Sequence, residues 1–129
     1  MPSSDSPPRL RIRVVFTDHA WLGPGKADLL EGIGATGSIA AAGRHLGMSY
    51  KRAWSLVETL NATFAEPLIE SSRGGARHGG ARLTKAGARV LALYRGIETH
   101  ASQSGAAEMA ALQAMLATPD ASTDMSAEK

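Results

Sequence analysis

The chain has 129 residues, of which 43% are hydrophobic and only 5% aromatic, so it can form one domain whose core is mostly aliphatic. It contains no cysteine, no signal-peptide pattern and no apolar run that could cross a bilayer, which excludes disulfide and thiolate chemistry and predicts a soluble cytoplasmic protein. The net charge of +2 conceals nine basic and three acidic residues between positions 44 and 95. This excess is typical of a protein that binds nucleic acid, but charge alone fits a solvated basic face equally well.

The N-terminal region predicts a strand between two irregular segments. Residues 1–8 are rich in Ser and Pro and are expected to be disordered. Residues 9–16 alternate at first between arginine and aliphatic side chains, and this period of two predicts a half-buried strand. Residues 21–25 end in Gly-Pro-Gly and predict a loop. A first helix is then expected over residues 26–36, with its C-terminal cap at Gly37 and the apolar face Leu29, Leu30 and Ile33.

The segment 38–64 predicts a helix-turn-helix. Ser38 suits the N-cap of a helix that ends near Leu46, and Ser49 suits the N-cap of a helix that runs to about Phe64. Gly47 can adopt the positive φ that the turn requires. The close contacts between the helices are assigned to Ala41, Ala42, Gly43, Leu46, Met48 and Ala53, and the apolar stripe of the last helix to Ala53, Val57, Leu60 and Phe64.

The following residues predict a wing and a long helix. Residues 67–70 and 81–83 are expected to be strands, and the stretch between them holds four glycines and a basic tip. Thr84 suits the N-cap of a helix that continues, with a break near Gly105, to about residue 116. We therefore expect one domain over residues 9–116 and a flexible tail over 117–129. Its fold class would be α+β and mostly helical.

Candidate DNA-binding residues lie at the start of the third helix and on the wing. The N-terminal part of a recognition helix meets base edges in the major groove, and arginine suits guanine O6 and N7. Arg52 is thus the candidate for base readout, whereas Trp54 is expected to belong to the core. Alternatively, Lys51 and Arg52 are ordinary charged residues that face solvent and do not contact DNA. The wing could likewise be a mobile glycine loop whose positive charge is incidental. The complete candidate set is Ser38, Ser49, Tyr50, Lys51, Arg52, Ser55, Arg73, Arg77 and His78.

No catalytic or metal-binding arrangement is visible in the sequence. The four histidines are scattered, no His, Asp and Glu spacing resembles a metal site, and the glycine-rich stretch lacks the Lys-Ser/Thr of a phosphate loop. We expect no enzyme activity, no metal and no cofactor.

The helix-turn-helix residues resemble a known family. The sequence resembles the N-terminal domain of the molybdate-dependent regulator ModE, most clearly in the run Leu-Gly-Met-Ser-Tyr-Lys-Arg-Ala-Trp at residues 46–54. The other similar stretches are residues 36–39, 41–42, 60–61, 67–70 and 81–87. The wider resemblance is to LysR-type winged helix-turn-helix domains. It implies a homodimeric transcriptional regulator that binds an inverted-repeat operator in double-stranded DNA, with residues 49–52 in the major groove and Arg73 and Arg77 on the backbone.

The C-terminal sequence departs from that family and predicts how the chain assembles. Full-length members carry β-barrel-type molybdate-binding domains, whereas the residues after Ile97 are helical in pattern, so tight molybdate binding is not expected of this chain. An oxyanion sensor and a winged helix that binds protein rather than DNA remain the alternative functions. The last helices carry one apolar stripe that predicts a dimer interface, the alternative being that the helix folds back onto its own domain. The stripe consists of Val90, Leu93, Ile97 and Ala101, then Met109, Leu112 and Leu116.

Overall fold

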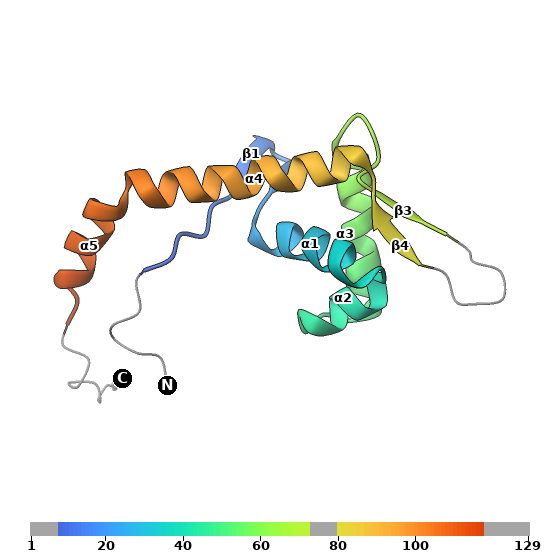
Figure 1. Ribbon diagram of the computed structural model, residues 1–129, viewed down its shortest axis with the longest axis horizontal. Coiled ribbons are helices and arrows are strands. Elements are labelled where there is room, and N and C mark those ends of the chain that lie inside the picture. Colours follow the sequence, from blue (N-terminus) through green and yellow to red (C-terminus); the bar gives the residue numbers. More distant parts are fainter. Residues whose placement is uncertain (1–7, 73–79, 118–129) are drawn as a thin grey trace. The chain divides into compact units, whose positions relative to one another are not determined.

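A computed structural model describes residues 8–72 and 80–117 of the chain. The chain divides into two compact units, one formed by residues 11–97 and one by residues 1–10 and 98–129. The predicted domain limits at residues 9 and 116 remain a prediction. In chain order the described elements are β1 (Val14–Thr17), β2 (Ala20–Leu22), α1 (Pro24–Thr36), α2 (Ile39–His45), α3 (Tyr50–Thr63), β3 (Ile69–Ser71), β4 (Ala81–Leu83), α4 (Lys85–Ser104) and α5 (Ala106–Ala114) (Figure 1).

The N-terminal strand is shorter than the sequence predicts and has an unexpected partner. It covers Val14–Thr17 instead of residues 9–16, and it pairs antiparallel with β2, part of which lies where a loop was predicted. The alternation of arginine and aliphatic residues describes side-chain exposure but does not supply a neighbouring strand. The backbone before β1 bonds to a side chain instead of a strand: the hydroxyl of Tyr94 donates a hydrogen bond of 2.6 Å to the carbonyl oxygen of Ile12.

The C-cap of α1 and the N-cap of α2 are those that the sequence predicts. α1 begins at Pro24, two residues earlier than expected, because proline fits the first turn of a helix where no N–H partner is needed. Gly37 ends α1 with a φ of 74°, and its N–H donates to the carbonyl of Ile33 at 2.8 Å. The hydroxyl of Ser38 accepts a hydrogen bond of 3.0 Å from the N–H of Ala41, which starts α2.

The core of the unit 11–97 is aliphatic, as the composition predicts. α1 packs against α2 and β4, and α2 packs against α3 (Figure 1). The apolar face predicted for α1 is buried, as are Ala53, Val57 and Leu60 of α3, while Phe64 is partly buried against this core. The largest fully buried side chains are Tyr94, Leu29, Leu30, Ile33, Leu60 and Leu68.

The β3–β4 ribbon is fastened to α3 and α4 by two polar side chains. Asn61 accepts hydrogen bonds from the N–H groups of Leu68 and Ile69 at 2.8 and 3.0 Å and donates to the carbonyl of Ile69 at 3.1 Å. Thr84 caps α4 as predicted by accepting from the N–H of Gly87 at 2.9 Å, and its hydroxyl donates to the carbonyl of Pro67 at 2.7 Å. These bonds set the position of the ribbon relative to α3.

The break predicted near Gly105 is present, because α4 ends at Ser104 and α5 begins at Ala106. α5 buries none of its residues, and three large apolar side chains in and just after it are exposed: Leu112, Met115 and Leu116. Among the described residues, no helix combines the length and the hydropathy needed to cross a membrane.

Candidate nucleic-acid interface

α2 and α3 form a tight helix-turn-helix corner around one glycine. A Cβ placed on Gly43 would lie 3.0 Å from the Cβ of Ala53, so the two helices approach too closely for a larger residue. The N–H of Met48 donates to the carbonyl of Gly43 at 2.9 Å, and Met48 is partly buried against the core. Gly47 has the predicted positive φ of 74°. Leu46 corrects the prediction, since it is 39% exposed instead of filling the corner: it lies at the C-cap of α2, beyond the packed helix face.

The start of α3 presents most of the predicted recognition residues to solvent. The hydroxyl of Ser49 accepts a hydrogen bond of 3.0 Å from the N–H of Arg52, which orders the first turn of the helix. Tyr50, Lys51, Arg52 and Ser55 are all exposed. Tyr50 packs edge-on against Trp54, with ring centroids 6.2 Å apart, and Trp54 is partly buried against the core as predicted.

Lys51 and Arg52 are the chemically informative members of this surface. Neither forms an ion pair with another residue of the described part of the chain. Cations that lie on the exposed first turn of a helix and have no carboxylate partner can bind phosphates or base edges without first breaking an internal ion pair. Ser38 lies at the start of the neighbouring α2, where its side chain caps that helix.

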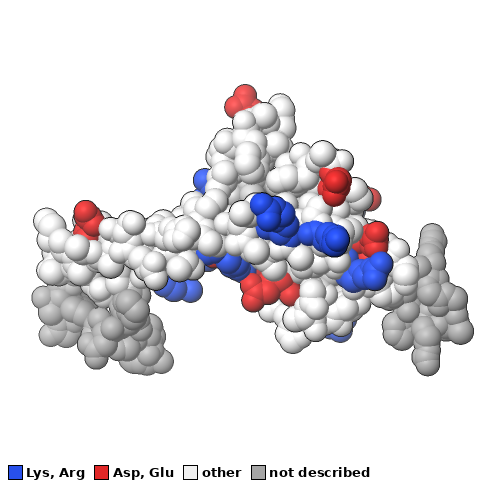
Figure 2. Space-filling view, turned by 45° about the horizontal axis from the view of Figure 1, so that its top comes forward, with Lys and Arg blue, Asp and Glu red and all other residues white. Residues whose placement is uncertain are grey.

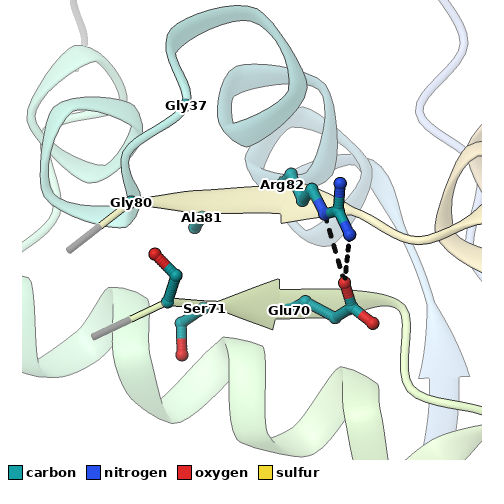
Figure 3. A pocket seen from close by; sticks show the side chains of 7 residues that line it. Gly37, Glu70, Ser71, Gly80, Ala81 and Arg82 are labelled. Carbon is teal, nitrogen blue, oxygen red and sulfur yellow. Dashed lines mark hydrogen bonds and ion pairs between the residues drawn. The ribbon is translucent and has the colours of Figure 1, made fainter. Parts of the chain in front are cut away.

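The described part of the wing is its base. β3 and β4 pair antiparallel, with Glu70 opposite Arg82, and the N–H of Ala81 donates to the carbonyl of Gly37 at 2.9 Å. Figure 3 shows the hollow on this ribbon and the Arg82 side chain reaching across to Glu70. The predicted wing contacts Arg73, Arg77 and His78 lie outside the described residues.

The excess of positive charge between residues 44 and 95 is partly neutralised in the fold. Arg95 forms ion pairs with Asp28 and Glu31 of α1, at 2.9 and 2.7 Å, and Arg82 pairs with Glu70 at 3.0 Å. Figure 2 accordingly shows basic and acidic side chains mingled on the face that it presents. Arg82 was missing from the predicted site, although its place between Ala81 and Leu83 in a short strand directs it outward by period two.

A second cluster of cations surrounds Trp21 on β2. The Arg13 guanidinium carbon lies 4.1 Å and the Lys26 Nζ 3.7 Å from the centre of the indole ring. Lys26 is 3% exposed, and its ammonium donates a hydrogen bond of 3.1 Å to the carbonyl of Trp21. Burial lowers the pKa of Lys26 below 10.5, and the nearby Arg13 charge lowers it further. The cluster brings β2 into contact with α1, since Trp21 lies in β2 and Lys26 in the first turn of α1.

The architecture and the sequence of this chain are similar to those of bacterial helix-turn-helix proteins. Residues 28–88 match the family model described as bacterial regulatory helix-turn-helix protein, lysR family. In the crystal structure of a CbnR_DBD–DNA complex, the matched chain is 27% identical and superposes with a TM-score of 0.55, covering 68% of the present chain and 95% of that one. The α+β winged helix-turn-helix fold predicted from the sequence is thereby confirmed.

Three curated proteins are similar to this chain over part of its length. The molybdenum-pterin-binding protein MopB of Rhodobacter capsulatus is 46% identical over 79 residues, which are 61% of this chain and 29% of that protein. The molybdenum transport protein ModE of Azotobacter vinelandii is 43% identical over 70 residues, or 54% and 26% of the two chains. The DNA-binding transcriptional dual regulator ModE of Escherichia coli K12 is 38% identical over 71 residues, or 55% and 27%. The matched segment thus spans less than a third of each relative.

Proposed function

We propose that the ModE-like helix-turn-helix domain that this chain carries binds double-stranded DNA in a sequence-specific manner and makes the chain a transcriptional regulator. The observation that carries this proposal is the first turn of α3, where Lys51 and Arg52 are exposed and form no ion pair within the described residues. The relative from Escherichia coli and the CbnR chain, both named for DNA binding, support it.

In this proposal α3 enters the major groove, which is wide enough for a helix. Arg52 donates two hydrogen bonds to the O6 and N7 atoms of a guanine, whereas Lys51, Ser49 and Tyr50 contact phosphates. Ser55 lies one turn further along the exposed side of α3, and Ser38 reaches the backbone from the start of α2. The Ser49 cap fixes the backbone of the turn that carries Arg52, so the guanidinium starts from a defined position.

The chain is further proposed to act as a homodimer on an inverted-repeat operator. Leu93 and Ile97 follow each other by one turn on α4 and are 54% and 43% exposed. Large apolar side chains in such a row are commonly covered by a partner, and a two-fold partner would present the same row. A two-fold dimer would place two recognition helices about 34 Å apart, or a multiple of that distance, along the DNA.

The DNA-binding proposal is tested by selecting genomic fragments with the full chain and measuring affinity by mobility shift at several salt concentrations. About six phosphate contacts would give a log–log salt slope near −5. Arg52→Ala should flatten the preference among operator variants, by about 1–3 kcal/mol at the contacted base pair, whereas Lys51→Ala should weaken all sequences alike. Absence of any shift at low salt would refute DNA binding, and an unchanged preference in Arg52→Ala would refute its assignment as the base reader.

A further inference from the structure

The ion pair between Glu70 and Arg82 lies on the solvent side of the wing base. Both the Nε and Nη2 atoms of Arg82 donate to a single oxygen, Oε1 of Glu70, at 3.1 and 3.0 Å. The two side chains are 79% and 53% exposed, and the strands that carry them are directly paired. The guanidinium therefore keeps donors that Glu70 does not use, and solvent has access to them.

The surroundings of this pair are balanced in charge. A hollow beside the ribbon is lined by two carboxylates, those of Glu66 and Glu70, and by two cations, those of Arg82 and Lys85. On the other side the hollow seen in Figure 3 is lined by Ser71 and Ser72, whose hydroxyls can donate to an anion. Within the described ribbon, Arg82 is the cation whose charge is directly cancelled by a partner.

We propose that Glu70 tunes how tightly the wing binds DNA by competing with phosphate for Arg82. In the free protein Arg82 is held on Glu70 across the ribbon. On DNA a phosphate must either displace the Glu70 carboxylate from the Nε and Nη2 donors of Arg82 or bind the guanidinium against the repulsion of that carboxylate. Glu70 thus limits the sequence-independent part of the affinity. This inference rests on the proposed DNA binding of the same domain.

The pair suits such a role because it contributes little to the fold. An exposed ion pair typically stabilises a protein by at most about 1 kcal/mol, so either residue can be replaced without unfolding the chain. The same limit applies to the DNA-binding free energy that is lost because Glu70 pairs with Arg82. It corresponds to at most about a fivefold change in affinity per half-site. One additional effective phosphate contact would also steepen the log–log salt slope by about 0.9 per half-site.

The test compares Glu70→Gln with a matched control, Glu66→Gln, in the full chain. Both substitutions remove one carboxylate from the rim of the same hollow, but only Glu70→Gln releases an arginine. Glu70→Gln should tighten binding to both specific and non-specific duplexes by up to about fivefold per half-site at low salt, with a steeper salt slope. Glu66→Gln should change the affinity by less. Equal gains in the two variants would show a general charge effect and overturn the proposal.

A double-mutant cycle with Arg82→Gln isolates the pair. In the Arg82→Gln background, Glu70→Gln has no arginine to release, and its gain should fall to that of Glu66→Gln. A gain that persists in this background, or a Glu70→Gln variant with wild-type affinity and salt slope, would overturn the inference while leaving DNA binding intact. A wild-type chain that shifts no duplex at all would instead refute the proposed function itself.

Discussion

Gly87, in the first turn of α4, is the position where a single methyl group is expected to do the most damage. A Cβ built there would overlap the carbonyl oxygen of Leu68 and lie 3.0 Å from its carbonyl carbon. The obstacle is backbone, so no side chain can rotate out of the way. The helix could only move away as a whole, and this would stretch the hydrogen bond of 2.9 Å from the N–H of Thr84 to the same Leu68 carbonyl.

Two unfavourable contributions and one favourable contribution set the change in the free energy of unfolding. Overpacking of this kind costs about 1–3 kcal/mol. Weakening the Thr84–Leu68 hydrogen bond costs roughly 0.5–1.5 kcal/mol more. Alanine is a better helix former than glycine by about 0.8–1.0 kcal/mol, which offsets part of the loss. Gly87→Ala should therefore lower the free energy of unfolding by about 0.5–3.7 kcal/mol in total.

The same helix offers a matched control. Gly96 also lies in α4, and a Cβ there would meet no atom within 4 Å. Gly96→Ala should raise stability by up to about 1 kcal/mol because only the helix propensity changes. Urea unfolding at one fixed protein concentration, followed by far-ultraviolet circular dichroism, measures both variants. If Gly87→Ala were as stable as Gly96→Ala, the close approach of α4 to Leu68 would be wrong.

Three further predictions address the wing, the dimer and the buried lysine. Asn61→Ala removes the side-chain partner of three backbone groups at Leu68 and Ile69 and should lower the free energy of unfolding in urea by about 2–4 kcal/mol. Asn61→Asp keeps both acceptor contacts and should cost less, so the reverse order would contradict the geometry. Leu93→Glu combined with Ile97→Glu should convert a dimer into a monomer in sedimentation at micromolar concentration, and a monomeric wild type would rule out the dimer. Because the pKa of Lys26 is lowered, the unfolded state retains its proton at a pH where the folded state has lost it. The stability of the wild type relative to Lys26→Met should thus rise as pH increases from that lowered pKa toward 10.5, and a flat or falling difference would refute the assignment.

The helix-turn-helix was predictable because the signals that define it are local. Ser38 and Ser49 cap helices through bonds to N–H groups three residues away, and Gly37 and Gly47 take the positive φ that only glycine adopts readily. The exposed start of α3 followed from the inward stripe of the same helix. Each of these features depends on one or two helical turns of sequence, so periodicity and residue type were enough.

The N-terminal strand was predicted less well because pairing depends on a second segment. The alternation before Val14 is real, yet the strand forms only where β2 returns alongside it. The requirement for Gly87 is likewise hidden in the sequence, since the obstructing carbonyl belongs to Leu68, in a separate segment on the other side of the wing. A glycine in a helix signals a close approach only once the neighbouring backbone is known.

The charge of the candidate interface shows the same division. The sequence alone determined that basic residues concentrate between positions 44 and 95 and that Lys51 and Arg52 lie at the start of α3. Only the tertiary structure decided which of those charges are cancelled, by bringing Arg95 onto α1, more than sixty residues away. Coulomb attraction acts on distance in space, and distance along the chain carries almost no information about it once the chain has folded.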